Sequence, residues 1–162
     1  SMKTLVVIFT VLMFGIQTVE AVEIISGPNN LHGIQVTPTL VVTAYHGVGE
    51  TLKTNLGDVV WVDTKKDLAL VQTQPTTDPM IVCSTAPTHL IRIFDPHYSI
   101  AGNLWYRTFE SKRGDSGSAY YEDGKLVGMV NGVSYGDLNI YTFGVSCGDI
   151  MREVKRYIAF KK

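Results

Sequence analysis

The sequence predicts an all-β fold, either a sandwich or a pair of small barrels, completed by one C-terminal helix. Of the 162 residues, 45% are apolar and 18% are charged, so the chain has enough apolar side chains to bury a core. Short runs rich in Val, Ile, Thr and Tyr recur between turn residues, at a spacing too short for βαβ units. A helical repeat of apolar residues follows near the C-terminus.

Ten segments have the composition expected of strands. They lie at residues 22–26, 33–36, 39–44, 58–62, 68–73, 90–94, 104–109, 118–121, 125–130 and 139–146. Turn residues separate them, for example Gly-Pro-Asn-Asn at 27–30 and Glu-Asp-Gly at 122–124. The one expected helix covers 150–160, with Asp149 as its N-cap. Its apolar face is formed by Met151, Val154 and Ile158.

The length of the chain suits one domain, or two small lobes that share an interface. The stretch 73–88 contains three prolines, which is typical of a connector. We therefore expect an N-terminal lobe at 1–82 and a C-terminal lobe, which includes the helix, at 89–162.

The charge balance argues against some partners. Fourteen Lys and Arg residues against fifteen Asp and Glu residues give a net charge of -1, so the chain has no overall basic surface for nucleic acid or anionic membranes. We expect no nucleic-acid partner, and we interpret the basic C-terminus as a solvated helix face. This basic group comprises Arg152, Lys155, Arg156, Lys161 and Lys162.

Two cysteines, Cys83 and Cys147, are too few for a disulfide scaffold, and their spacing does not fit a zinc cluster. We expect two buried free thiols. Three histidines have no carboxylate or cysteine at ligand spacing, and we expect them on the surface or in turns. They are His32, His89 and His97.

The N-terminal segment allows two interpretations. The mostly apolar run 5–16 and the small-residue end at 19–21 fit a secretory signal peptide over residues 2–21. The β-branched side chains of 5–11 instead favour a buried strand, which is the interpretation we prefer. About 12 mostly apolar residues are too few for a membrane-spanning helix, which needs roughly 20.

A glycine-flanked serine is the sharpest chemical feature of the sequence. Ser116 lies in the segment Lys-Arg-Gly-Asp-Ser-Gly-Ser at 112–118, where a tight turn would expose its hydroxyl group. The same turn would bring backbone N–H groups together at a point that suits an oxyanion. A serine hydroxyl is a weak nucleophile unless a base takes its proton and a carboxylate orients that base.

The sequence offers both the base and the carboxylate at the edges of apolar runs. His46 follows the run 40–45, which places an imidazole at the mouth of a strand. Asp67 begins the run 67–71, where a carboxylate would be partly desolvated. Two other carboxylates compete with Asp67 but begin no apolar strand, namely Asp58 and Asp63.

Three motifs resemble those of the chymotrypsin-like serine proteases. Thr-Ala-Tyr-His at 43–46 resembles the family's Thr/Ser-Ala-x-His segment, and Asp-Leu-Ala-Leu at 67–70 resembles its Asp-x-Ala-Leu segment. Gly-Asp-Ser-Gly-Ser at 114–118 is similar to its nucleophile loop, and the order His, Asp, Ser also agrees. The resemblance extends over about two thirds of the chain, from 33 to 145. It implies two antiparallel Greek-key β-barrels, trypsin-like, with the site in the cleft between them and a C-terminal α-helix outside.

The resemblance also implies a role for each residue of the site. His46 would be the general base and acid, Asp67 would orient it, and Ser116 would be the nucleophile. The backbone N–H groups of Gly114 and Ser116 would form the oxyanion hole. No metal and no cofactor is expected. The implied activity is hydrolysis of a polypeptide substrate through an acyl-enzyme.

The family's substrate pocket corresponds to further positions in this chain. Glu110, six residues before Ser116, would lie at its base and favour Lys or Arg before the scissile bond, because a cation relieves an unpaired buried carboxylate. Alternatively, Glu110 faces solvent or pairs with Lys112 or Arg113. No histidine occurs at 126–133, which disfavours Gln or Glu in the substrate. The other expected pocket residues are Phe109, Asn131, Gly132 and Val133.

The motifs are closely spaced, since Asp67 follows His46 by 21 residues and Ser116 follows Asp67 by 49. This short spacing, and the sequence of the segment 124–133, resemble those of the small proteases in positive-strand RNA virus polyproteins. Examples are the proteases of flaviviruses, astroviruses, arteriviruses and alphavirus capsids. The resemblance implies polyprotein processing in the host-cell cytoplasm, with membrane association only through neighbouring polyprotein segments. Flavivirus proteases take an apolar cofactor strand from a neighbouring protein, and residues 3–13 would supply such a strand in cis.

Two other functions stay open at this point. One is a secreted cellular trypsin-like protease with residues 2–21 as its signal peptide. The other is a protease-fold binding module that cuts once or not at all, with its own C-terminus blocking the cleft.

Overall fold

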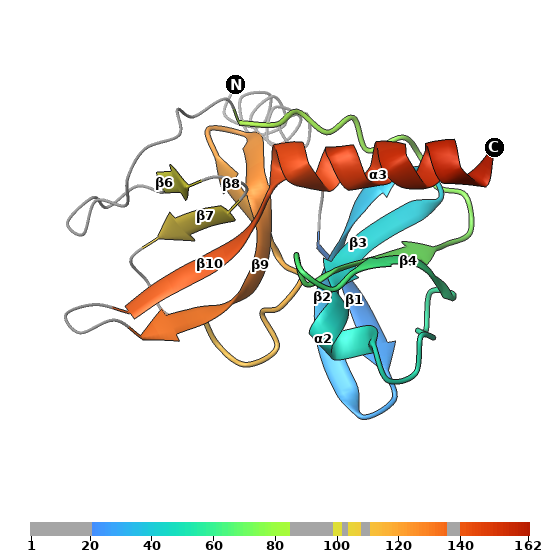
Figure 1. Cartoon of the computed structure of the whole chain (residues 1–162), viewed down its shortest axis with the longest axis horizontal. Coiled ribbons are helices and arrows are strands. Elements are labelled where there is room, and N and C mark those ends of the chain that lie inside the picture. Colours follow the sequence, from blue (N-terminus) through green and yellow to red (C-terminus); the bar gives the residue numbers. More distant parts are fainter. Residues whose placement is uncertain (1–20, 85–98, 102–103, 108–110, 136–139) are drawn as a thin grey trace, which may run out of the picture.

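The computed structural model describes residues 21–84, 99–101, 104–107, 111–135 and 140–162, and consists of two antiparallel five-stranded sheets and a C-terminal helix (Figure 1). The first sheet contains, in spatial order, β1 (Ala21–Ser26), β2 (Asn29–Thr37), β3 (Leu40–Ala44), β5 (Leu68–Gln72) and β4 (Val59–Asp63). The second contains β6 (Ser99–Ala101), β7 (Leu104–Arg107), β10 (Ile140–Ser146), β9 (Lys125–Tyr135) and β8 (Ala119–Glu122). The predicted all-β fold class is confirmed.

The two central strands of the first sheet position the site. All five residues of β3 are buried, as are the first four of β5, in agreement with their continuous apolar sequences. The strands are antiparallel, and Ala44 at the end of β3 pairs with Leu68 at the start of β5. The residues that follow β3 and those that precede β5 therefore lie side by side.

A shared core joins the two sheets. One cluster of buried side chains includes Ile34 and Leu70 from the first sheet together with Met129 and Val145 from the second. The helix α3 (Cys147–Lys161) lies across both sheets and adds apolar side chains such as Val154 to the same cluster (Figure 1). The connection between the sheets passes through 73–84, and its end runs beside the start of β9, where Cys83 forms a parallel bridge with Leu126.

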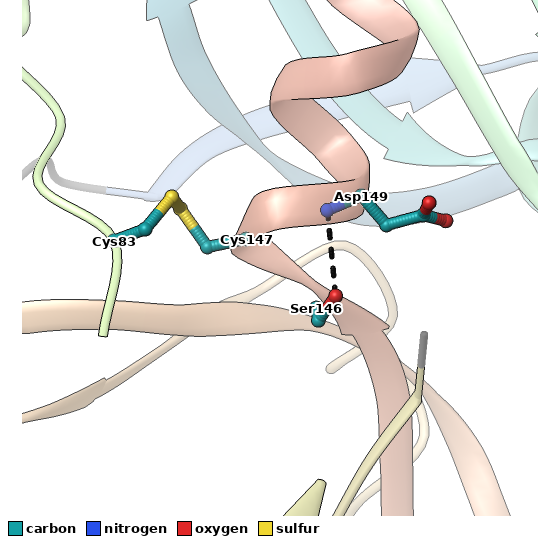
Figure 2. Close-up of a disulfide and its surroundings, with 4 residues drawn as sticks. All are labelled: Cys83, Ser146, Cys147 and Asp149. Atoms are coloured by element: carbon teal, nitrogen blue, oxygen red, sulfur yellow. Dashed lines mark hydrogen bonds between the residues drawn. A yellow bond between two sulfur atoms is a disulfide. The ribbon is translucent and has the colours of Figure 1, made fainter. Parts of the chain in front are cut away.

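Two details of the helix differ from the prediction. It begins at Cys147, and its N-cap is Ser146, whose hydroxyl accepts a hydrogen bond of 3.4 Å from the N–H of Asp149 (Figure 2). Asp149 lies in the first turn, so its expected role as the cap is wrong. Ile158 is 40% exposed, whereas Tyr157 is buried, because position 157 continues the i, i+4, i+7 line of buried residues that starts at position 150.

The prediction of two free thiols is also wrong. Cys83 and Cys147 form a disulfide with a Cα–Cα distance of 5.4 Å, which ties the connecting segment to the first residue of α3 (Figure 2). The two residues meet because hydrogen bonds on either side of Cys83 hold the connector beside Leu126, at 2.9 Å from Leu126 N to Val82 O and 2.8 Å from Ser84 N to Leu126 O. Spacing along the sequence carries no information about this approach.

Several predictions concern residues outside the described part of the chain. They include the strand at 90–94, the N-terminal strand or signal peptide, the pocket residues Phe109 and Glu110, and the histidines His89 and His97. Among the helices described here, none combines the length and the apolar character that crossing a bilayer requires.

Candidate active site

The base and its carboxylate come from the adjacent ends of β3 and β5. A short helix, α2 (Tyr45–Val48), follows β3 directly and carries His46 in its first turn. The backbone N–H of Tyr45 donates a hydrogen bond of 3.1 Å to the carbonyl oxygen of Asp67. This bond extends the pairing of the two strands by one residue, which brings the side chains of His46 and Asp67 together.

The three side chains predicted from the motifs form a continuous hydrogen-bonded chain. The Asp67 carboxylate accepts two bonds from His46, at 2.6 Å from ring Nδ1 and 2.7 Å from the backbone N–H. On the other side of the ring, His46 Nε2 lies 3.1 Å from the Ser116 hydroxyl oxygen. Since Nδ1 donates to Asp67, Nε2 of the neutral ring is free to accept the hydroxyl proton. The competing carboxylates Asp58 and Asp63 do not take this position.

The environment stabilises the charges that this arrangement requires. The hydrogen bond to Asp67 raises the pKa of His46 above its ordinary value, against the opposing effect of partial burial. Partial burial acts to raise the pKa of Asp67, but hydrogen bonds from His46 and Asn131 outweigh it, and this pKa is lowered. Asp67 is therefore ionised at neutral pH, and it stabilises a protonated His46.

Asn131 holds the carboxylate from a second direction. Its side-chain amide donates to the Asp67 backbone carbonyl at 2.9 Å and to the Asp67 carboxylate at 3.1 Å. Its side-chain oxygen accepts from the backbone N–H of Val145 at 3.1 Å, and the residue is 6% exposed. Asn131 was predicted to be a residue of the substrate pocket. Asn131 does line the cleft, but its side-chain amide donates to Asp67. No sequence motif predicts this contact.

The backbone of the serine loop has the conformation that a tight turn requires. The N–H of Asp115 donates to the carbonyl of Lys112 at 3.0 Å, and Gly114 at the third position of this turn has a φ of +95°, as in a type II turn. Gly117 has a φ of +85°, and a Cβ there would overlap the carbonyl oxygen of His32. In the described part of the chain, no acceptor occupies the N–H groups of Gly114 and Ser116. Both donors are thus available to an oxyanion.

His32 on β2, which was predicted to be a surface or turn histidine, binds this loop through two hydrogen bonds. Its Nδ1–H donates a hydrogen bond of 2.9 Å to the carbonyl of Gly114. Its backbone N–H donates one of 2.8 Å to the carbonyl of Ser116. These two bonds fix the peptide groups 114–115 and 116–117, which flank the Ser116 N–H on either side. A lone histidine in a strand gives no sequence signal for this role.

A cleft of about 810 Å³ opens beside His46 and Ser116, which both line it. Its walls come from residues 28–31, from the serine loop and from β9, including the predicted pocket residues Gly132 and Val133. The charged or titratable side chains in the described lining are His46, Lys112, Arg113 and Tyr135. In the same described residues, no group of three His, Cys, Asp or Glu side chains is arranged to bind a metal ion.

The chain is similar to known proteins in its three-dimensional structure. No model of a protein family matches the chain, and no curated protein matches it by sequence. A serine-to-alanine mutant of Rv3671c from M. tuberculosis H37Rv, in an inactive form, has a TM-score of 0.64 and 16% identity over 88% of each chain. The Rv3671c protease, also in an inactive form, has a TM-score of 0.61 and 17% identity over 85% of this chain and 88% of that one.

A serine endoprotease from Yersinia pestis has a TM-score of 0.66 and 14% identity over 86% of this chain. The match covers 63% of the Yersinia chain. At these identities the likeness concerns the fold alone. The chain therefore has the chymotrypsin-like fold of these serine proteases, with two antiparallel sheets and a C-terminal helix.

Proposed function

We propose that this chain is a serine endopeptidase that cleaves peptide bonds through an acyl-enzyme. The observation that carries the proposal is the continuous contact from Asp67 through His46 to the Ser116 hydroxyl, at 2.6 and 3.1 Å. A buried or structural serine would need neither an oriented imidazole nor free N–H groups beside it.

In the proposed reaction, Ser116 Oγ attacks the substrate carbonyl carbon while its proton moves to His46 Nε2. The N–H groups of Gly114 and Ser116 stabilise the resulting oxyanion. The C–N bond then breaks as His46 gives its proton to the leaving amine. A water molecule, deprotonated by the same imidazole, hydrolyses the ester, and the proton returns to Ser116. Asp67 keeps its negative charge and stabilises the imidazolium throughout.

Replacement of Ser116 tests this proposal. Ser116→Ala should abolish turnover of a fluorogenic peptide and labelling by a fluorophosphonate probe, while the thermal unfolding midpoint stays close to that of the wild type. Ser118→Ala removes a hydroxyl from the same loop and should keep both activities. Hydrolysis that survives in Ser116→Ala would contradict the proposal. Several turnovers per wild-type molecule would exclude the single-cut binding module.

For specificity, we propose Lys or Arg before the scissile bond, on the basis of Glu110 six residues before Ser116. A peptide library randomised at that position should favour basic residues, and Glu110→Gln should weaken this preference. A preference that Glu110→Gln leaves unchanged would assign the pocket to other residues.

Two cellular settings fit this activity. The compact motif spacing supports processing of a viral polyprotein in the host cytoplasm. The Cys83–Cys147 disulfide supports the alternative of a secreted protease, because disulfides persist in oxidising compartments and are rare in the cytosol. Mass spectrometry of the protein after expression in eukaryotic cells distinguishes the two. A mature N-terminus near Val22 would support secretion and contradict the polyprotein setting.

A further inference from the structure

The backbone of Asp67 adopts a conformation that the surrounding structure must maintain. Its φ is +52°, in the left-handed region that residues other than glycine rarely occupy. Such conformations are strained and persist only where neighbouring contacts impose them. Tyr45 and Asn131 donate hydrogen bonds to the carbonyl of Asp67. A second attachment holds the turn of residues 63–67, which leads into Asp67.

Lys66 makes that second attachment. Its ammonium group lies 3.0 Å from Glu153 Oε1 and 3.3 Å from Asp149 Oδ1, both on α3. A third carboxylate oxygen, on Asp63 in the same turn, lies at 3.8 Å. The side chain of Lys66 is 19% exposed, so its ion pairs are largely shielded from solvent. Lys66 thus connects the turn directly to two successive turns of the helix.

The carboxylates that receive Lys66 are rigidly placed. The side chains of Glu153 and Asp149 are 1% and 4% exposed, respectively. The indole of Trp61 on β4 donates a hydrogen bond of 2.8 Å to the other oxygen of Glu153. Burial acts to raise the pKa of Glu153, but hydrogen bonds from Trp61 and Lys66 lower it to about 2. Glu153 is therefore ionised across the whole neutral range, as its ion pair with Lys66 requires.

We propose that Lys66 is a positioning residue for the active site: by binding Glu153 and Asp149 it holds the turn 63–67, and with it the Asp67 carboxylate, against His46. This inference rests on the proposed protease function. Its physical basis is that Lys66 and Asp67 are consecutive, so that a displacement of one changes the backbone of the other. Small misplacements of a catalytic group can cost up to roughly a hundredfold in rate.

Lys66→Gln removes the cation from the turn. Asp149 still pairs with Arg152, and Glu153 with Arg156, both on α3. We expect kcat per active site to fall about ten- to a hundredfold, with KM nearly unchanged. We also expect the pKa of His46 to decrease, because its hydrogen bond to Asp67 is what raises it. Lys66→Arg, which restores a cation of similar reach, should recover most of both quantities. The charged neighbours of His46 in the cleft, Lys112 and Arg113, stay in place.

Arg156→Gln is the matched control. Arg156 also binds Glu153 Oε1 at 3.0 Å, but its side chain is 63% exposed and it lies on the helix itself. Its loss removes a cation from the same carboxylate without releasing the turn. The His46 pKa should therefore equal that of the wild type, and kcat should stay within about twofold of the wild-type value. A second test variant, Glu153→Gln, keeps an acceptor for the Trp61 indole and weakens the ion pairs with Lys66 and Arg156. It should lower both quantities less than Lys66→Gln does.

Two measurements decide the outcome. Active-site titration corrects kcat for any unfolded fraction, and NMR titration of the His46 imidazole reports its pKa without any substrate. If Lys66→Gln keeps the wild-type His46 pKa and the wild-type turnover per active site, the proposal is overturned. If Lys66→Gln does not fold, the same result for Glu153→Gln overturns it. If the wild type hydrolyses no peptide, the protease function fails, and the NMR titration alone still tests the link from Lys66 to Asp67.

Discussion

The contact between Asp67 and His46 sets the pH at which the proposed reaction begins. Only a neutral His46 can accept the Ser116 proton, and its pKa is raised above the ordinary value of about 6.5. As the pH falls through this raised pKa, the base becomes protonated and activity is lost. We therefore expect the acid limb of the kcat/KM profile to have its midpoint above about pH 6.5.

Asp67→Asn should move that midpoint to lower pH, because the interactions that raise the His46 pKa come from the carboxylate. The asparagine amide would also donate to Nδ1 and favour the wrong tautomer, which should cost about ten-thousandfold in kcat. A pH series of peptide hydrolysis measures both effects, and Asp58→Asn, which removes a carboxylate elsewhere, should reproduce the wild-type profile. An unchanged midpoint in Asp67→Asn would argue against this account.

Residues whose role follows from local sequence could be predicted, and residues that act across the fold could not. His46, Asp67 and Ser116 each stand next to an apolar run or a glycine, so their motifs are visible in the sequence. His32 and Asn131 contact the site through strand registers that the sequence does not reveal. The bonds from His32 Nδ1 to the Gly114 carbonyl and from Asn131 to Asp67 join residues 82 and 64 positions apart.

At the scale of elements, most strands could be predicted because runs rich in Val, Ile, Thr and Tyr, and the turn residues between them, are local signals. The short helix α2 was missed because its four residues contain a glycine and have no cap side chain. The start of α3 was placed too late because Ser146, its cap, also continues the strand pattern of β10. The disulfide was missed because it depends on how the connector lies against β9.

The disulfide anchors the N-terminal end of α3, the helix that carries the partners of Lys66. It closes a loop of 64 residues, and a cross-link of that length is expected to stabilise the protein by about 4 kcal/mol by restricting the unfolded chain. Urea unfolding should therefore show a loss of this size for the Cys83→Ser, Cys147→Ser double variant. A reductant should destabilise the wild type similarly and leave the double variant unaffected. Equal stability of both proteins would show that the cross-link is not formed.

At the scale of the whole molecule, one helix connects the two sheets through both apolar and ionic contacts. Val154 and Tyr157 of α3 belong to the core cluster that both sheets share, and Tyr157 packs against Trp61 with ring centroids 5.9 Å apart. The same indole donates a hydrogen bond to Glu153, so Trp61 joins the first sheet to α3 through both an apolar and a polar contact. A core shared in this way predicts a single cooperative unfolding transition for both lobes.

Glu153 makes the stability of this assembly dependent on acid. Its pKa is about 2 in the folded protein, against an ordinary value of 4.5, so the folded state binds this proton less readily than the unfolded state. The stabilisation, on the order of 3 kcal/mol, is fully present above about pH 4.5 and is lost as the pH falls toward about 2. Glu153→Gln should be less stable at pH 7 and lose less stability over that interval. Glu23→Gln, at an exposed position on β1, should keep the wild-type dependence in urea unfolding measured at each pH. Parallel curves for Glu153→Gln and the wild type would assign the acid sensitivity to other carboxylates.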